Sequence, residues 1–369
     1  MAFLSHGGHR GGELVGGKVL DDPFFHASRD LRRSSAMIRK SADASHRKSE
    51  MRGCCDLGSS YFRLLVAEGE FPEDGRLECG RFRGRTVRDE RRHIGWGEDL
   101  ASDGSIGSAA LSRSLELARE LVEISRGAGC PRPALVATNA LREARNAPAV
   151  AGAVERETGL SVRVLSQREE ASYGFLGAAF FARLRGGLCL VDIGGTSTEV
   201  SWGRGLSMEG FAGLPVGTHR VRAALAALAE GEGGAARVAE LLESYDASIP
   251  APGSAVYPLP AFAERPTMLA TGGTAVSLAV ALRVLRGLEP VFEEAERMTL
   301  DDLGLVRRWL AGIVRSGEEG SLPFDAGRAR LLPAGVMLAE SLLNALGARE
   351  FAVTARDLRW GVVLEGRGA

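Results

Sequence analysis

The sequence predicts an α/β protein of two related domains that face one another across a cleft, and two observations support this. Strand-like and helix-like stretches alternate from residue 53 to the end of the chain, which is typical of α/β layers. A turn made of an acid, glycine and hydroxyl residues occurs twice, at 56–60 and 192–196, each time between two strand-like runs. The simplest explanation of the repeat is that two domains each contribute one turn to a shared cleft.

The composition of the chain agrees with this size and sets limits on its partners. The 369 residues, 45% of them hydrophobic, provide apolar material for about two domains. The net charge of −1 argues against a nucleic-acid partner, and no apolar run reaches the roughly 18 residues of a membrane helix. Five cysteines without a C-x-x-C spacing indicate reduced thiols and a cytoplasmic location: Cys54, Cys55, Cys79, Cys130 and Cys189.

The first 50 residues differ from the rest, because they are rich in Gly, Ser, Arg and Lys and show no sustained apolar period. Such a segment buries too little surface to offset its ordering entropy, so we expect residues 1–50 to be a mobile extension. Met51 is a candidate natural start, in which case the extension is not native. The two domains are then expected at 51–175 and 176–369, with a final helix that could pack back on the first domain.

The elements of the first predicted domain follow in chain order. A strand, a tight turn and a second strand come first, and an amphipathic helix that ends in glycine follows. A short buried strand leads into a helix start, and another strand precedes a helix with an apolar stripe. These five stretches are 54–69, 107–129, 133–146, 161–166 and 167–187.

The second predicted domain begins with a continuous apolar strand, which is typical of the centre of a sheet. Two helices follow, then a strand with a glycine pair and a helix, then two more helices, and finally a strand with a short helix. The stretches are 188–195, 217–231, 235–249, 267–285, 299–317, 333–348 and 350–366.

The two repeated turns suit phosphate. Glycine lets the backbone approach a ligand and expose consecutive N–H groups, and Ser and Thr add donors without bulk. A third glycine turn, 271–274, precedes a helix, whose N-terminus favours anions. The predicted phosphate-binding residues are Gly58, Ser59, Ser60, Gly194, Gly195, Thr196, Ser197, Gly272, Gly273 and Thr274. An ordinary glycine-rich hairpin is the alternative for either turn taken alone.

An acid beside a phosphate site requires a cation. Mg²⁺ binds through one or two carboxylates together with phosphate oxygens and water, so Asp56 and Asp192 are predicted to lie near the metal. Neither a Ser-His-Asp order nor a cluster of metal-ligating histidines is evident in the sequence, which leaves carboxylates to carry the chemistry.

Several blocks resemble the exopolyphosphatase/guanosine pentaphosphate phosphohydrolase family of the actin-like ATPase superfamily. They occur in family order from about Cys54 to the C-terminus: DLGSSYFRLLVA, VATNALREARN, LSQREEASYGFLGA, VDIGGTSTEVSWG, GLPVGTHRV, LATGGTAVSLA and VTARDLRWGVVLE. The resemblance implies two RNase H-like (actin-like ATPase) domains with an interdomain cleft. It covers the short, two-domain form of the family.

The resemblance also implies roles for five residues. Glu170 matches the proposed catalytic base, and Glu199 matches a second acid that helps to hold the water or the metal. Asp56 and Asp192 match the metal-proximal acids, and Arg142 matches a phosphate-facing arginine. Glu170 begins a helix, so its dipole is expected to keep the carboxylate ionised.

Each of these residues also has a plainer interpretation. Glu170 could be an ordinary glutamate of a first helical turn, although Glu169 beside it is the better candidate for a purely structural acid. Glu199 could face solvent on its strand. Arg142 could pair with Glu143 or Glu169 on the surface, but its planar guanidinium suits phosphate.

Two positions depart from the family pattern. Ser60 stands where the first turn usually has asparagine, and Thr196 stands where the second usually has a third glycine. Both replacements are small and hydroxylated, so the predicted phosphate sites are retained, while substrate preference and rate stay open.

A local group of arginines lies between the first turn and the first amphipathic helix. Alternation would place Arg81, Arg83 and Arg85 on one face of a strand, with Arg88, Arg91 and Arg92 following. The group could guide a polyanion to the cleft. An edge strand that carries charges against aggregation is the alternative.

The predicted function is Mg²⁺-dependent release of terminal orthophosphate from inorganic polyphosphate by a hydrolase acting on phosphoanhydrides. Three alternatives stay open: a guanosine pentaphosphate 5′-phosphohydrolase, a phosphotransferase to ADP, and a regulator that binds polyphosphate or guanosine tetraphosphate and hydrolyses little. Relatives are often homodimers, but no stretch of this chain indicates one.

Overall fold

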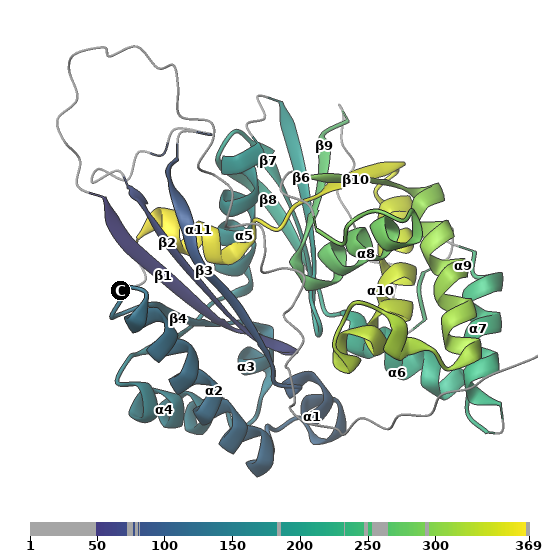
Figure 1. The fold of residues 1–369 in the computed structure, drawn as a ribbon, viewed down its shortest axis with the longest axis horizontal. Helices are drawn as coiled ribbons and strands as arrows, with labels where there is room; N and C mark the ends of the chain where they lie inside the picture. Colours follow the sequence, from purple (N-terminus) through teal and green to yellow (C-terminus); the bar gives the residue numbers. More distant parts are fainter. Residues whose placement is uncertain are drawn as a thin grey trace, which may run out of the picture.

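The structure is a computed structural model, which describes residues 49–71, 77, 80, 82–182, 186–231, 233–246, 250–252, 265–291 and 295–366. The predicted extension, residues 1–50, therefore lies almost wholly outside the described residues. Figure 1 shows two bodies side by side, each with a sheet flanked by helices. No helix in the described part of the chain has the length and hydropathy needed to cross a membrane.

The first sheet has five strands in the order β3-β2-β1-β4-β5. β1 pairs antiparallel with β2, and β4 runs parallel to both β1 and β5. The strands are β1 (Glu50–Leu57), β2 (Tyr61–Glu70), β3 (Arg83–His93), β4 (Ala134–Ala137) and β5 (Val162–Val164). The accompanying helices are α1 (Trp96–Asp103), α2 (Ser108–Gly127), α3 (Asn139–Glu143) and α4 (Ala147–Thr158).

The second sheet has six strands in the order β10-β11-β9-β6-β7-β8. They are β6 (Gly187–Ile193), β7 (Thr198–Arg204), β8 (Ser207–Leu214), β9 (Thr267–Thr271), β10 (Glu296–Thr299) and β11 (Glu350–Val353). The remaining helices are α5 (Gln167–Ala182), α6 (Thr218–Leu228), α7 (Gly234–Ser244), α8 (Gly272–Leu285), α9 (Leu300–Ser316), the 3₁₀ turn η2 (Glu319–Ser321), α10 (Ala326–Ala345) and α11 (Leu358–Glu365).

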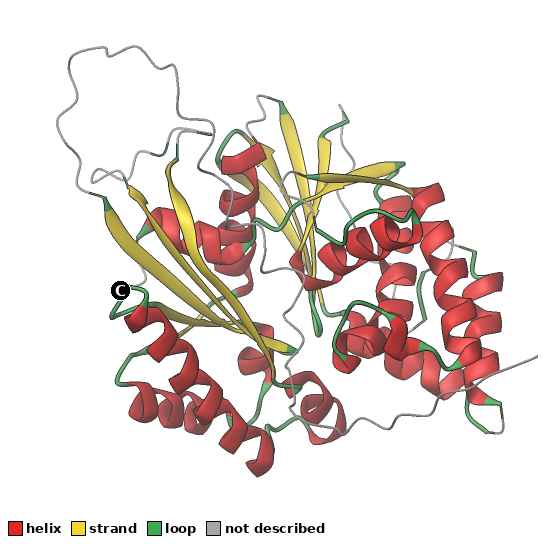
Figure 2. Cartoon of the chain, in the orientation of Figure 1, coloured by secondary structure: helices red, strands yellow, loops and turns green. Residues whose placement is uncertain are grey.

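Helices cover both faces of both sheets, and the period-two alternation of the strands divides the core accordingly (Figure 2). In β1, Cys55 faces the cluster built with α2 and α4, whereas Cys54 faces the cluster built with α11. In β6, Val191 belongs to the large core under α8, α9 and α10, and Leu190 packs with Phe175 of α5. α5 and α11 therefore lie between the two sheets.

Below, the first half means the first sheet with α1–α4 and α11, and the second half means the second sheet with α5–α10. The yellow helix α11 lies against the purple strands of the first half, although the sequence reaches it only after the last strand of the second half (Figure 1). Its residues Leu358, Trp360 and Val363 are buried with Leu65 and Val136 of the first sheet.

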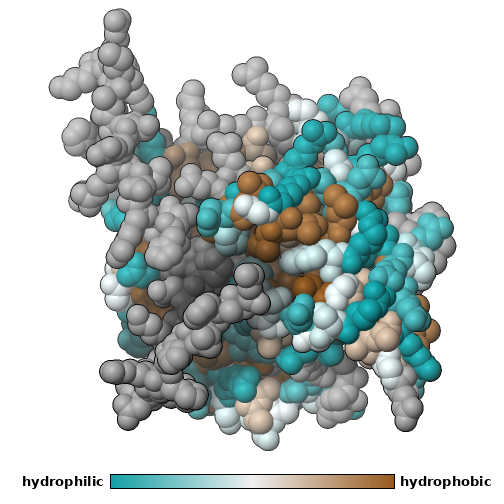
Figure 3. Space-filling model, turned by 45° about the vertical axis from the view of Figure 1, so that its right-hand side comes forward, coloured by the Kyte–Doolittle hydropathy of each residue, from teal (hydrophilic) through white to brown (hydrophobic). Residues whose placement is uncertain are grey.

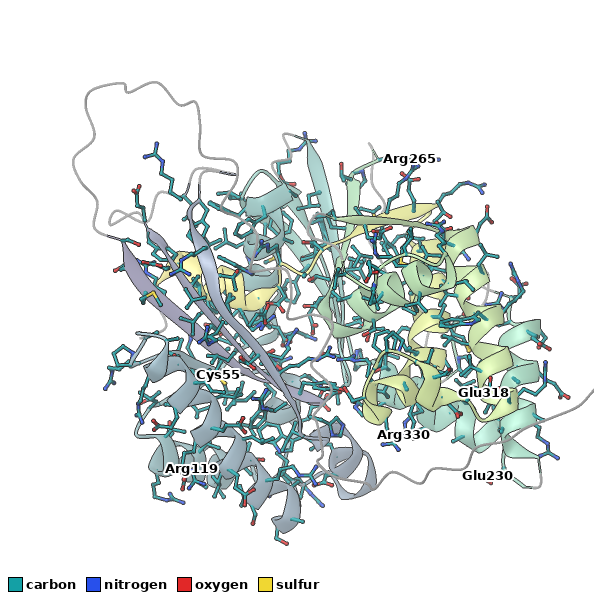
Figure 4. All side chains as sticks on the ribbon, viewed as in Figure 1. Cys55, Arg119, Glu230, Arg265, Glu318 and Arg330 are labelled. Atoms are coloured by element: carbon teal, nitrogen blue, oxygen red, sulfur yellow. The ribbon has the colours of Figure 1, made fainter. Side chains whose placement is uncertain are left out.

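The described cysteines lie in the core as free thiols, and many charged residues lie at the surface. Cys54, Cys55, Cys130 and Cys189 are free and buried, and Cys79 lies outside the described residues. In Figure 4 the labelled Cys55 lies inside the first half, whereas the exposed Arg119, Glu230 and Glu318 lie at the periphery.

The surface combines charged residues with a few exposed hydrophobic ones. Figure 3 shows a face on which hydrophobic residues gather, bordered by hydrophilic ones. The exposed large hydrophobic residues of the described chain are spread over several elements: Val164, Leu228, Leu285, Leu288 and Leu305. The homodimer stays a prediction.

One helix begins earlier than the sequence pattern indicates. The sequence predicts this helix at 333–348, which begins with Pro333. In the structure α10 starts at Ala326 and contains Pro333, since the side chain of Asp325 caps the helix by accepting a hydrogen bond from the Arg328 backbone N–H at 2.9 Å. The earlier start brings Arg328 to the pocket described below.

Candidate active site

One pocket lies between the two halves, and most predicted site residues line it. From the first half come Asp56, Gly58, Ser59, Ser60, Tyr61, Arg63, Thr138, Asn139 and Leu358. From the second half come Glu170, Asp192, Ile193, Gly194, Gly195, Thr196, Ser197, Glu199, Thr218, Gly272, Gly273, Thr274 and Arg328. Of the predicted residues, Arg142 does not line it.

The two repeated turns have the same internal geometry. In the first, the Gly58 N–H donates to the Tyr61 carbonyl at 3.2 Å; in the second, the Gly194 N–H donates to the Ser197 carbonyl at 2.9 Å. The matching positions lie 136 residues apart in both cases. The sequence repeat is therefore a repeat of backbone structure.

The residues opposite the two turn acids differ in charge. Asp56 pairs across the first hairpin with Arg63, and Asp192 pairs across the second with Glu199. Arg63 donates to Asp56 Oδ2 from Nη2 at 2.6 Å and from Nε at 3.1 Å. The residue seven positions after the acid is thus the basic Arg63 in the first half and the acidic Glu199 in the second. The second turn therefore has two acids side by side.

The two turns approach each other closely. A Cβ added to Gly195 would lie 2.5 Å from the Oγ atoms of both Ser59 and Ser60, so a larger residue here would have to displace both serine side chains. Ser60 Oγ also lies 2.9 Å from Nε2 of His219, at the start of α6. The turns therefore face one another, as the repeat predicted.

The third turn closes the pocket beside the second. Gly272 has φ of +85°, and a Cβ there would lie 2.2 Å from Asp192 Oδ1. Both facts require glycine at this position. α8 begins at the same residue, so the free N–H groups of its first turn lie near the carboxylates and any bound anion.

Burial dominates the electrostatics of the carboxylates. It raises the pKa of Asp192 to about 6, partly offset by the charge of Arg63. It raises the pKa of Glu199 well above its usual range, and the neighbouring charges of Glu170 and Asp192 raise it further. These acids repel one another in a poorly solvated site, so each holds its proton to a higher pH than it would in water.

Glu170 is not kept ionised in the way that its place at the start of α5 indicated. Burial raises its pKa to about 7, the charge and hydrogen bond of Arg142 oppose this, and the charges of Asp56 and Asp192 add to it. The helix dipole is therefore outweighed by desolvation. A carboxyl with a pKa near neutrality is suited to accept a proton.

Arg142 contacts neither Glu143 nor Glu169 in the hydrogen bonds and ion pairs of the described chain. Its Nη1 donates to Glu170 Oε2 at 2.6 Å and to the Leu165 carbonyl at 2.8 Å. Its Nη2 donates to Asn139 Oδ1 at 3.2 Å. The predicted phosphate-facing role stays a prediction, since the guanidinium of Arg142 bonds the Glu170 carboxylate and does not line the pocket. Glu169 is half-buried and pairs with Ser166 and Arg163, as expected of a structural acid.

The donor set fits a hard divalent cation. Asp56 Oδ1 and Glu199 Oε1 are buried and have no hydrogen-bond partner among the described residues, and Asp192 lines the same pocket. In the described chain no three acids, histidines or cysteines form a complete metal site. Mg²⁺ stays a prediction, and at this site it would take its other ligands from phosphate and water.

Two arginines of the pocket were absent from the residues predicted from the sequence. Arg63 bridges Asp56 and Asp357, whose Oδ2 lies 2.8 Å from Nη1. Arg328 is buried, its guanidinium lies 4.5 Å from the centroid of the Tyr61 ring, and a Cβ on Gly273 would lie 2.5 Å from its Nη2. Arg63 could have been found from its place opposite Asp56 in the hairpin. Arg328 could not, because it depends on the early start of α10.

The arginine group of β3 lies on the edge strand of the first sheet. Arg85 pairs with Glu68 at 2.7 Å, and Arg92 pairs with Glu120 at 2.7 Å. Arg81 lies outside the described residues. These pairings favour the edge-strand interpretation over a free basic surface.

Comparisons with known proteins agree with this geometry. The model of the Ppx/GppA phosphatase family matches residues 82–367. A curated relative named exopolyphosphatase 1, from Mycobacterium tuberculosis, is 27% identical over 320 residues, 85% of this chain and 87% of the relative. The same name is carried by a relative from Mycobacterium leprae, also at 27% identity, which is covered to 88%.

Solved structures show the same fold. A Ppx/GppA family member from Aquifex aeolicus aligns with a TM-score of 0.62 at 22% identity, over 86% of this chain and 98% of the other. An exopolyphosphatase from Cytophaga hutchinsonii aligns with a TM-score of 0.65 at 18% identity, over the same shares. The predicted actin-like fold and the predicted hydrolase acting on phosphoanhydrides are thereby confirmed: the chain belongs to the Ppx/GppA phosphatase family.

Proposed function

We propose that this phosphatase is a Mg²⁺-dependent exopolyphosphatase, which releases terminal orthophosphate from inorganic polyphosphate. The observation that carries the proposal is the convergence of three glycine turns and the guanidinium groups of Arg63 and Arg328 on one pocket that also holds four carboxylates. Donors on several sides of a cleft suit a chain of phosphates better than a single anion. The mycobacterial relatives named exopolyphosphatase 1 support the same substrate class.

In this proposal Glu170 is the general base. Its carboxylate takes a proton from a water molecule, whose oxygen forms a bond to the terminal phosphorus. The bond from that phosphorus to the bridging oxygen breaks, and its electron pair leaves with the shortened chain. The products are orthophosphate and a polyphosphate one unit shorter.

The remaining residues hold and neutralise the chain. The side chains of Arg63 and Arg328 donate to phosphate oxygens. So do the N–H groups of the three turns, apart from those of Gly58 and Gly194, which bond within their own turns. One or two of the carboxylates of Asp56, Asp192 and Glu199 would hold Mg²⁺ together with phosphate oxygens and water, and the ion would supply charge neutralisation on the phosphoryl oxygens. The buried carboxylate oxygens without a partner would then be satisfied.

Orthophosphate release provides the direct test of the substrate. The purified full chain is given polyphosphate of several lengths, guanosine pentaphosphate, or polyphosphate with ADP, each with Mg²⁺ or with EDTA. We expect orthophosphate from polyphosphate that depends on Mg²⁺. Release from guanosine pentaphosphate alone, formation of ATP, or binding without release would each overturn the proposal.

Two adjacent glutamates provide a matched pair for the catalytic base. Glu170→Gln should lower kcat on polyphosphate by about 10²- to 10⁴-fold, because general-base catalysis is lost. Glu169→Gln changes a half-buried acid next to it, which does not line the pocket, and should leave kcat within about two-fold of the wild type. Equal losses in both variants, or none in Glu170→Gln, would contradict the assignment.

A further inference from the structure

A chain of hydrogen bonds connects the second turn with Glu170. Asn139 Nδ2 donates to Thr196 Oγ1 at 3.0 Å, and Asn139 Oδ1 accepts from Arg142 Nη2 at 3.2 Å. Arg142 Nη1 in turn donates to Glu170 Oε2 at 2.6 Å. The chain crosses from the second half to the first at Thr196 and returns at Glu170.

The direction of each bond in this chain is determined by chemistry. A guanidinium can only donate, so the atom of Asn139 facing Arg142 must be the amide oxygen and the other must be the NH₂ group. Thr196 Oγ1 therefore accepts from Asn139 and keeps its own proton for another acceptor. Thr196 lines the pocket, so an anion in the second turn is a suitable acceptor.

The chain is built into the wall of the site. Asn139 is buried at the start of α3, Glu170 is buried in α5, and Arg142 is largely covered. The remaining member, Thr196, is one of the two departures from the family pattern. A glycine at position 196 would leave the Asn139 NH₂ group without this hydrogen-bond partner. In a poorly solvated site, linked hydrogen bonds strengthen one another.

On this geometry, and resting on the proposed function, we propose that Thr196 and Asn139 are positioning residues. When a phosphate chain occupies the second turn, they hold Arg142 and, through it, orient the carboxylate of Glu170 toward the attacking water. Binding of phosphate at the second turn thereby affects the orientation of Glu170.

Kinetics distinguish positioning from direct binding. Thr196→Val and Asn139→Leu should each lower kcat on polyphosphate roughly 3- to 10-fold, the effect of about one hydrogen bond, and change KM less than about two-fold. Thr196→Ser keeps the hydroxyl and should restore kcat, whereas Thr196→Gly should behave like Thr196→Val. Losses confined to KM, or failure of Thr196→Ser to restore kcat, would overturn the proposal.

A double-mutant cycle tests whether the two residues act through the same chain. The Thr196→Val/Asn139→Leu double variant should be no slower than the slower single variant, because breaking either bond already disconnects Thr196 from Arg142. Multiplied losses would mean that the residues act separately, which would refute the relay.

A readout that needs no turnover comes from the rarity of asparagine. The chain contains three asparagines, Asn139, Asn146 and Asn344, so labelling asparagine side-chain amides with ¹⁵N yields three NH₂ signal pairs. Adding orthophosphate with Mg²⁺, which cannot turn over, should shift the Asn139 pair in the wild type but not in Thr196→Val. The Asn146 and Asn344 pairs should stay in place and report that the variant is folded.

The outcomes separate this inference from the proposed function. A responding Asn139 signal without orthophosphate release would refute the exopolyphosphatase and retain the relay. Orthophosphate release with an Asn139 signal that stays in place, or that moves equally in Thr196→Val, would refute the relay and retain the enzyme. Failure of both would refute both.

Discussion

At the scale of single residues, the site is a group of buried acids whose ionised forms lower the stability of the fold. Asp56 is compensated by Arg63, whereas Asp192 lies opposite Glu199 and has no cation across the hairpin. Burial raises the pKa values of Asp192, Glu199 and Glu170. These acids thus bind more protons in the folded chain than in the unfolded one, so without a metal their own contribution to stability should fall as the pH rises from about 4 to about 7.

Asp192→Asn tests this cost. The pKa of the Asp192 carboxyl is raised from 3.8 to about 6, so the ionised side chain destabilises the fold at pH 8 but is protonated at pH 4. Replacing it by the neutral asparagine should raise the free energy of unfolding by about 3 kcal/mol at pH 8 and change it little at pH 4. Urea unfolding at both pH values in EDTA would measure this, and activity should fall at the same time. Destabilisation at pH 8, or the same effect at both pH values, would contradict the explanation.

At the scale of elements, α5 and α11 pack so closely that they contact each other through glycines. A Cβ on Gly177 of α5 would lie 2.2 Å from the Asp357 carbonyl oxygen, and one on Gly361 of α11 would lie 2.1 Å from that of Tyr173. Asp357 caps α11 and also binds Arg63. The close contact of the two helices therefore fixes a partner of the first turn's arginine.

Gly177→Ala should push the two helices apart. We expect a loss of about 1–3 kcal/mol in the free energy of unfolding, because the opposing atom is backbone and cannot rotate away. Gly312→Ala is the matched control, since no atom lies within 4 Å of a Cβ at that position in α9. It should gain about 0.5–1 kcal/mol from the higher helix propensity of alanine. A neutral Gly177→Ala in urea unfolding would contradict the close packing.

At the scale of the whole molecule, a few polar contacts hold the halves together around the pocket. Ser60 bonds His219, Asn139 bonds Thr196, and Tyr61 Oη donates to Asp325 at 2.7 Å. His219 is the titratable member, and burial lowers its pKa to about 4, with the charges of Arg222, Arg328 and His93 adding to the effect. The contact between the halves thus favours a neutral imidazole.

Acid should therefore weaken the apposition of the halves through His219. An imidazole freed from this contact has its ordinary pKa near 6.5, so the contact excludes a proton and loses about 2 kcal/mol when the pH falls to 5. Small-angle scattering at pH 7.5 and pH 5 would measure the radius of gyration of the wild type and of His219→Gln. The acid-induced increase should be larger in the wild type, and identical responses would contradict this role.

Much of the site could be predicted because it is local in the chain. A turn with its acid, glycines and hydroxyls is a continuous stretch, so the positions of Asp56, Asp192, Gly195 and Gly272 are recognisable from the order of the residues alone. The alternation of strands and helices indicates the order of the elements for the same reason. A repeated local pattern also implies that two turns face one another, and the close contact of Gly195 with Ser59 and Ser60 agrees with this.

The sequence by itself determined the fold class, the three turns and the acids beside them, because hydrophobic period and turn chemistry depend on neighbours in the chain. The tertiary structure alone decided that Arg328 reaches the pocket, that Arg142 contacts Glu170, and that Glu170 has a pKa near 7. The physical reason is that desolvation and ion pairing depend on groups brought together from distant parts of the chain, and no local pattern records them.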